Sequence, residues 1–346
     1  MIEMTETFRP ATLGEILDRT AQLYRRNFWL FAGVAALPIA TLLAFTAIGG
    51  ALFAAAAAAF RSANLAGAMA NPAAIALFAL LALIAAPVYI ASAVFSYAGL
   101  MQAAASTHRG EKITIRGTLK SVRPWFWRYL WFIILQFIVT ILGPGTLAAG
   151  AVVALFYGEH ITGGNLATAP IFGLMIFVVV FAAIVAIILL ALGYSLGLPV
   201  CVLEEKPAWQ SLQRAWKLSQ GTRGRIFVMI LLVIALAIAA SMLAAIPTLI
   251  IVAVITAIGN GAAYSTTAIV VAEILRVMAD FALQVLLAPI SSIAIVLFYY
   301  DQRVRKEGFD IEWMMQQAGL AQPVSTMPPT EGAHISGPIG PPDTPS

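Results

Sequence analysis

Six long apolar stretches constrain this chain more than any other feature of its sequence. Each is long enough to cross the roughly 30 Å hydrocarbon core of a bilayer as a helix, which takes about 20 residues. They lack the strict alternation of barrel strands, so helices are predicted. With 61% hydrophobic and 10% charged residues, the chain has the composition of a multi-pass membrane protein. The stretches, called blocks here, cover residues 28–60, 73–105, 129–157, 169–203, 226–258 and 266–300.

The distribution of basic residues predicts the orientation of the blocks. Lys and Arg are concentrated in the cytoplasmic loops of membrane proteins. Here they lie before the first block, after the last, and in the loops that follow the second and fourth blocks, while the other three loops contain only Arg61. We therefore expect six crossings with the N- and C-termini in the cytoplasm. The net charge of +4 reflects this asymmetry, so the expected partners of the basic loops are anionic lipid headgroups and not nucleic acid.

The N-terminus and the cysteine content narrow the class further. The first block is long and follows an amphipathic stretch, unlike a cleavable signal peptide, so we expect the N-terminus to stay attached. The single cysteine, Cys201, excludes an intramolecular disulfide and a Cys-rich metal site. We expect it to be a packed helix residue.

A similar stretch precedes each pair of blocks, which predicts three related units. Each stretch has the pattern of an amphipathic helix at the cytoplasmic interface, followed by a transmembrane hairpin. The fold class predicted is therefore all-α, with six transmembrane helices in three pseudo-repeated hairpins. The units cover about 11–108, 113–205 and 207–306.

The three amphipathic helices carry the residues that we expect to anchor them at the membrane surface. Thr12 and Glu15 have the spacing of a capping box at the start of the first helix. Apolar residues three or four apart form a stripe on each helix, and Trp and Tyr favour the headgroup region. Two interpretations stay open: the helices only brace the bundle, or they form a collar that docks a partner or senses lipid. The candidate anchors are Leu17, Tyr24, Leu119, Trp125, Trp209, Leu212 and Trp216.

The segments outside the membrane domain differ in composition. Residues 1–27 form the N-terminal segment with its amphipathic helix, and residues 28–300 the six-helix domain. Residues 301–315 combine a basic stretch with a short helix that Asp310 is expected to cap. Residues 316–346 contain seven prolines and few apolar residues, which predicts a disordered tail.

Every block contains an interior proline, which predicts kinks. The third block has the strongest breaker, Gly143-Pro144-Gly145. Kinked helices can line a transporter cavity, but prolines are frequent in membrane helices in any case. The six prolines are Pro38, Pro87, Pro144, Pro199, Pro247 and Pro289.

The last block contains an unusual polar stripe. Glu273, Arg276 and Asp280 are one helical turn apart and can pair, and Gln284 and Ser291 continue the same face. Charges in hydrocarbon should face protein or water. However, counting about 20 residues back from the inner end of the block leaves Glu273 and Arg276 at or beyond the outer headgroups. The stripe is thus either a wet feature of the outer surface or a buried polar network, with Asp280 and Gln284 its deepest members.

Three stretches together resemble a known family. FRPATLGEILDRTAQLYRRNFWLF (8–31), PVCVLEEKPAWQSLQRAWKLSQG (199–221) and LFYYDQRVRKEGFDIEWM (297–314) are similar to bacterial multi-pass proteins labelled "glycerophosphoryl diester phosphodiesterase membrane domain". The resemblance covers roughly residues 8–315. It implies a membrane domain that accompanies a phosphodiesterase in some proteins, and it supplies no catalytic residues.

The sequence offers no convergent catalytic set. A phosphodiesterase barrel takes about 250 residues of alternating strands and helices, and no segment has that pattern. His108, His160 and His334 are expected in the cytoplasm, outside the cell and in the tail, so they cannot share a metal site. No Walker, nucleophile-elbow or HExxH motif is present. We therefore expect a protein that is not an enzyme and has no cofactor.

Two functions lead, and a membrane-embedded enzyme ranks third because the sequence lacks a convergent set of catalytic groups. The first is a structural, scaffolding or regulatory protein of the bacterial inner membrane, with a protein partner or a second copy of the chain bound to it. The alternative is a transporter or lipid-handling protein with a polar path near Asp280 and Gln284. A polar cavity at mid-membrane that contains Asp280 and Gln284 favours the second function, and a tightly packed interior favours the first.

Overall fold

The computed structural model describes residues 11–59, 72–161, 169–258 and 266–308. These residues are almost entirely helical, and six helical stretches are long and apolar enough to cross a membrane. The predicted class of helical multi-pass membrane protein is therefore confirmed. The predicted helix at Asp310 and the tail 316–346 lie outside the described residues.

The six spanning stretches are built from longer helices and short irregular turns. Five shorter helices in the described ranges, α1, α5, α6, α9 and α10, are not long enough to span a membrane by themselves. The elements are α1 (Leu13–Arg26), α2 (Phe28–Ala59), α4 (Pro72–His108), α5 (Ile115–Val122), η2 (Arg123–Trp125), α6 (Phe126–Phe137), η3 (Ile138–Leu142), α7 (Gly143–Ile161), α8 (Ala169–Tyr194), α9 (Gly197–Leu203), α10 (Ala208–Ser219), α11 (Arg223–Ile258) and α12 (Thr266–Glu307).

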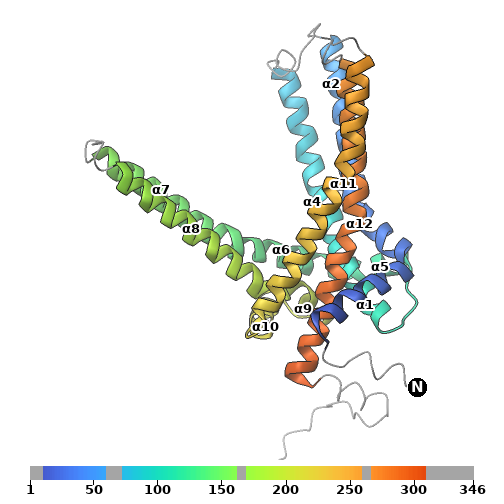
Figure 1. The fold of residues 1–346 in the computed structure, drawn as a ribbon, viewed down its shortest axis with the longest axis vertical. Coiled ribbons are helices and arrows are strands. Elements are labelled where there is room, and N and C mark those ends of the chain that lie inside the picture. The colour runs from blue at the N-terminus through green and yellow to red at the C-terminus, as the bar shows by residue number, and fades with distance from the viewer. Residues whose placement is uncertain (1–10, 60–71, 162–168, 259–265, 309–346) are drawn as a thin grey trace, which may run out of the picture.

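The long helices form two limbs that share one base (Figure 1). In the first limb, α2 packs on α4, and α12 packs on α2, α4 and α11. In the second limb, α7 and α8 form a hairpin that diverges from the first limb. The hairpin meets the first limb only near the base, where α8 contacts α10 and α11.

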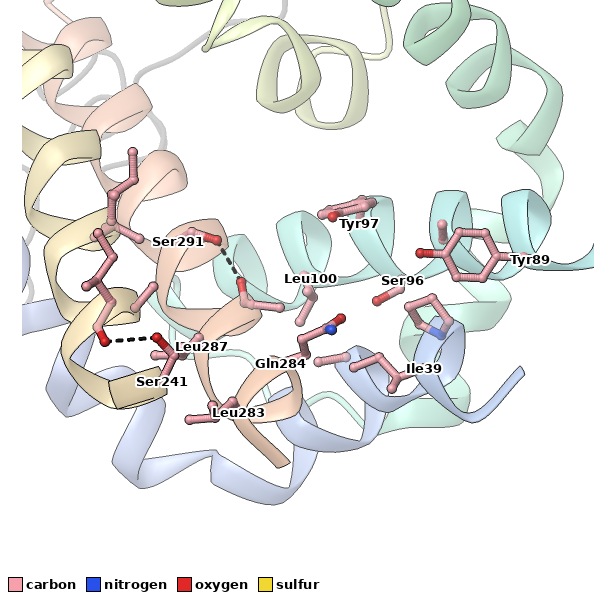
Figure 2. A pocket seen from close by; sticks show the side chains of 18 residues that line it. Ile39, Tyr89, Ser96, Tyr97, Leu100, Ser241, Leu283, Gln284, Leu287 and Ser291 are labelled. Carbon is pink, nitrogen blue, oxygen red and sulfur yellow. Dashed lines mark hydrogen bonds between the residues drawn. The ribbon is translucent and has the colours of Figure 1, made fainter. Parts of the chain in front are cut away.

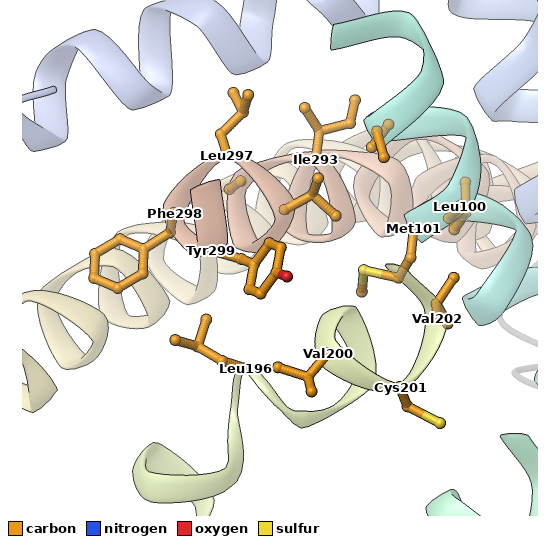
Figure 3. Close-up of a cluster of buried hydrophobic side chains, with 14 of the residues drawn as sticks. Leu100, Met101, Leu196, Val200, Cys201, Val202, Ile293, Leu297, Phe298 and Tyr299 are labelled. Carbon is orange, nitrogen blue, oxygen red and sulfur yellow. The ribbon is translucent and has the colours of Figure 1, made fainter. Parts of the chain in front are cut away.

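The base is where α1, α5, α9 and α10 gather around the C-terminal ends of α4 and α12, and we call it the basic end. Its core is apolar: Leu100 of α4, Leu196 before α9, and Val200, Ile293 and Tyr299 are almost completely buried (Figure 3). Along the upper parts of both limbs, by contrast, large apolar side chains are exposed on most faces. This is the burial pattern expected of helices that face lipid, because lipid tails are as apolar as the side chains.

The third spanning stretch changes its helical type at the predicted breaker. Ile138–Leu142 form a turn of π-helix, after which the chain continues as α7 through Gly143-Pro144-Gly145. Pro144 has no N–H for the carbonyl of Thr140, and a π turn accommodates such a gap without ending the helix. The hydroxyl of Thr146 donates to the carbonyl of Leu142 at 2.8 Å. The breaker therefore widens the helix locally and does not terminate it.

The fourth spanning stretch is interrupted before its proline. α8 ends at Tyr194 and α9 begins at Gly197, so Pro199 lies in the first turn of α9, where its missing N–H costs little. Two glycines near the interruption face aromatic rings: Gly193 lies against the indole of Trp216, and a Cβ on Gly197 would lie 2.6 Å from Phe132. Glycine thus permits α8 and α9 to approach α10 and α6 closely.

Candidate functional site: a lateral cavity and the ionic base

A half-open cavity of about 570 Å³ lies between the helices of the first limb, and several of its lining side chains, Gln284 among them, are exposed. Its walls come from α2, α4, α11 and α12, and Figure 2 shows the lining side chains. The helices α4 and α11 do not pack closely on each other, and the cavity lies between them. Most of its lining is apolar, including Ile39, Leu100, Leu283 and Leu287.

A few polar groups interrupt the apolar lining. The amide of Gln284 points into the space beside Ser96 and Leu100 (Figure 2). The hydroxyls of Ser96, Ser241 and Ser291 also line the cavity, but each donates to a main-chain carbonyl, at 2.9 Å in all three cases. Their oxygens keep lone pairs that can accept a hydrogen bond. Tyr89 and Tyr97 complete the polar lining.

The predicted polar stripe of the last block is only partly placed. Gln284 and Ser291 face the cavity. Arg276 is exposed on α12, well toward the N-terminal half of that helix. The side chains of Glu273 and Asp280 lie outside the described part of the structure. The cavity therefore contains the deep end of the stripe, and the pairing of its three charges stays a prediction.

The predicted surface anchors occupy different environments. Leu212 is buried in the core of the basic end, whereas Trp209, three residues earlier on α10, is 57% exposed. Trp216 packs between the Tyr194 ring, at 5.2 Å between centroids, and the guanidinium of Arg223, 3.9 Å from its ring centre. Trp125 is 42% exposed and carries the guanidinium of Arg128 over its ring. The remaining anchors, Leu17, Tyr24 and Leu119, are half-buried.

The basic end also contains an ionic cluster that the sequence reasoning missed. The carboxylate of Asp301 is buried, and the guanidinium groups of Arg225 and Arg305 lie 3.3 and 3.0 Å from it. The main-chain N–H of Ala11 donates to Asp301 at 2.8 Å, and both arginines donate to the carbonyl of Ala11. One carboxylate thus joins the start of α1, the start of α11 and the end of α12.

A second carboxylate, Glu204, joins α9 to α10 and α12. It pairs with Arg214 and Lys206 and accepts a hydrogen bond from the hydroxyl of Tyr299 at 2.8 Å. Burial raises the pKa of Glu204, but the hydrogen bonds from these three donors outweigh it and leave the pKa below its ordinary value. The only local signal for the Asp301 cluster was the four-residue spacing of Asp301 to Arg305.

The histidines do not form a site with other ligands in the described residues. His108 ends α4, with its ring 5.3 Å from that of Tyr300, and His160 lies at the far end of α7. No group of three or more His, Cys, Asp or Glu side chains in the described ranges could hold a metal ion. Cys201 is buried in the core, as expected for a packed helix residue.

Comparison with known proteins adds no identification. The chain matches no family model, no curated protein and no solved structure. The arrangement of the helices, the cavity and the basic end are therefore the basis for a functional proposal.

Proposed function

We propose that this chain is a non-enzymatic membrane protein that takes a lipid-like molecule into the cavity of its first limb. The observation that carries the proposal is the cavity itself, at about 570 Å³ with a mostly apolar lining and the amide of Gln284 inside it. Ligand sites commonly enclose 300–1,000 Å³ and combine apolar walls with a few polar groups. An amphipathic molecule matches that combination better than an ion or a sugar.

The position of the cavity supports a ligand that arrives from the bilayer. It lies between α4 and α11, and both helices contain a stretch that is long and apolar enough to cross a membrane. A molecule moving between these helices would not have to leave the hydrocarbon region. Gln284 can both donate and accept hydrogen bonds, so it suits the polar head or an ester group of such a molecule.

A pair of matched variants tests this function. Leu287→Trp places a large side chain in the cavity, whereas Leu286→Trp changes the neighbouring residue, which is 40% exposed and does not line the cavity. Both proteins are purified in mild detergent, and the lipids that accompany them are extracted and quantified. We expect one lipid species to fall severalfold with Leu287→Trp and to be retained with Leu286→Trp. Identical lipid content in the wild type and both variants would contradict the proposal.

The scaffolding function remains a second candidate because of the α7–α8 hairpin. The hairpin stands apart from the first limb, and large side chains such as Phe177 and Phe181 are exposed on it. A partner helix or a second copy of the chain could pack there. A photo-crosslinking residue at Phe177 should then give a defined adduct in native membranes, and crosslinking to lipid alone would count against this function.

The proposal also includes the internal repeats, the topology and the cellular location that the sequence predicts. We infer three related units at about 11–108, 113–205 and 207–306, both termini in the cytoplasm, and a place in a bacterial inner membrane. The order of elements supports the units, since a short helix (α1, α5 or α10) precedes each pair of spanning stretches.

A further inference from the structure

A second hollow, of about 600 Å³, lies on another side of the α2–α4 pair. Its wall is formed by Leu37 of α2 and by Val88, Ala91 and Phe95 of α4. On a helix these α4 residues lie on a different face from Ala93 and Ser96, which line the first cavity. We call this second hollow the α5 groove, because α5 closes one end of it.

Three cations stand at that end of the α5 groove. Arg116, Lys120 and Arg123 are spaced four and three residues apart, which puts them on one face of α5 and its continuation η2. All three are exposed. Within the described residues no ion pair involves them. By contrast, a carboxylate partner is present for each of four other arginines of the basic end, Arg109, Arg214, Arg225 and Arg305. The positive charge at the groove is therefore uncompensated.

The groove is formed by packing and does not depend on a ligand to hold its shape. Two glycines allow α5 to pack closely on the first limb. Gly33 of α2 faces Ile115, and a Cβ on Gly99 of α4 would lie 3.5 Å from Thr118. Thr118 and Val122 are buried on the inner side of α5. The wall residue Phe95 stacks on Phe126 at 5.0 Å between centroids. Thus α5, which carries the cations, and the apolar wall keep fixed relative positions.

We propose that the α5 groove binds one anionic phospholipid from the leaflet beside the basic end. The phosphate lies among Arg116, Lys120 and Arg123, and an acyl chain lies along Leu37, Val88 and Phe95. Guanidinium and ammonium groups are the usual partners of phosphate. Leu37 and Val88 belong to membrane-spanning stretches, where lipid is the molecule in contact with the protein. This inference is independent of the ligand of the first cavity, because it concerns another face of α4.

The experiment measures the thermal stability of the purified protein in mild detergent as phosphatidylglycerol is added. The test variant is Arg116→Gln/Lys120→Gln/Arg123→Gln. The matched control, Arg25→Gln/Arg26→Gln/Lys112→Gln, removes the same charge from exposed residues of the basic end that do not line the groove. We expect half-maximal stabilisation of the test variant to need on the order of 100-fold more phosphatidylglycerol, since each of the three cations near an anionic headgroup adds about fivefold to affinity. The control should respond as the wild type does.

A groove-filling variant tests the acyl-chain part of the proposal. Ala91→Phe keeps the three cations and occupies the apolar wall, so it should also weaken the response to phosphatidylglycerol. The proposal is overturned if phosphatidylcholine stabilises the wild type equally, or if the control triple loses the response as much as the test triple. It is also overturned if glycerol phosphate alone reproduces the effect and Ala91→Phe retains it, because the ligand is then a free phosphate.

Discussion

Asp301 is the residue on which the basic end depends most. Its carboxylate is 2% exposed and receives Arg225, Arg305 and the N–H of Ala11, three groups that come from different parts of the chain. A buried charge is costly unless it is paired and hydrogen-bonded, and here all of its neighbours are donors. The cluster therefore fixes the chain ahead of α1 against α11 and α12.

Replacing Asp301 should destabilise the protein strongly. Asp301→Asn removes the charge and leaves two guanidinium groups facing each other, which we expect to cost about 2–4 kcal/mol because both arginines are partly solvated. Thermal unfolding in detergent measures the loss. The control is Glu111→Gln, whose side chain is 52% exposed in its pair with Arg109 and should contribute only about 0–1 kcal/mol. Equal effects of the two variants would contradict the assigned role of Asp301.

Glu204 should make the stability of the protein depend on pH. Its pKa is lower in the folded protein than in the unfolded chain, so its stabilising contribution is complete above the ordinary carboxyl pKa of about 4.3. The contribution is lost as the pH falls through the lowered pKa of the folded state. We therefore expect Glu204→Gln to unfold at a lower temperature than the wild type at pH 7, with the difference shrinking below about pH 4. A difference that stays constant from pH 7 to pH 3 would argue against this.

At the scale of elements, small residues determine which helices can pack closely at the core of the basic end. α8 runs close to α10 because Gly193 leaves room for the indole of Trp216, and the hydroxyl of Ser219 donates to the carbonyl of Gly193 at 2.9 Å. A side chain at Gly193 would meet the rigid ring and not a flexible chain end. The contact therefore sets the distance between the hairpin and the basic end.

Two glycines of the same helix should respond oppositely to alanine. Gly193→Ala should destabilise the protein by about 1–3 kcal/mol through overpacking against Trp216. Gly173→Ala, near the other end of α8, meets no atom within 4 Å and should be neutral or stabilising by up to about 1 kcal/mol, because alanine favours helix. Melting temperatures of both variants in detergent provide the comparison. Destabilisation by Gly173→Ala alone would show that the packing is misassigned.

Many of the helices and their caps were predictable from the sequence, for reasons that differ from helix to helix. The six apolar blocks predicted the spanning helices because length and apolarity suffice to recognise them. The capping box of Thr12 and Glu15 is present, because it depends only on residues three apart. The face of α10 that packs inside the protein was not predicted: it consists of Ala208, Ser211, Leu212 and Ala215, whereas the sequence pointed to Trp209, Leu212 and Trp216 as anchors at the membrane surface, which stays a prediction. Small residues carry little hydrophobic signal, so their burial depends on the partners that they meet.

At the scale of the whole molecule, contacts between distant segments escaped the sequence reasoning. Asp301 and Ala11 are 290 positions apart and Asp301 and Arg225 are 76 apart, and no local pattern relates such residues. The lining of the cavity could not be predicted for the same reason, since it comes from four helices near both ends of the chain. Gln284 and Ser291 were nevertheless anticipated as one polar face, because they lie on a single helix.

Thiol labelling should test the orientation of the whole molecule. In a Cys201→Ala background, Tyr157→Cys lies at the far end of α7, where Tyr157 is 67% exposed, and Gln213→Cys lies on the exposed face of α10. With both termini in the cytoplasm, an impermeant reagent should label Tyr157→Cys in intact cells and Gln213→Cys only after permeabilisation. Ser219→Cys serves as a fold control, because Ser219 is fully buried and should stay unlabelled in both. The reverse labelling pattern would invert the topology.

The divergence of the α7–α8 hairpin affects the membrane as well as the protein. With 26 residues, α8 is about 39 Å long, so it fits a hydrocarbon core of about 30 Å when it is tilted by roughly 40°. If the first limb stands upright, the two limbs are close together at the basic end and far apart at the other. The protein and the lipids that fill the space between its limbs then take up more lateral area in one leaflet than in the other. We therefore expect a membrane protein of this wedge-like outline to be enriched in curved bilayer regions, where the two leaflets differ in area in the same sense.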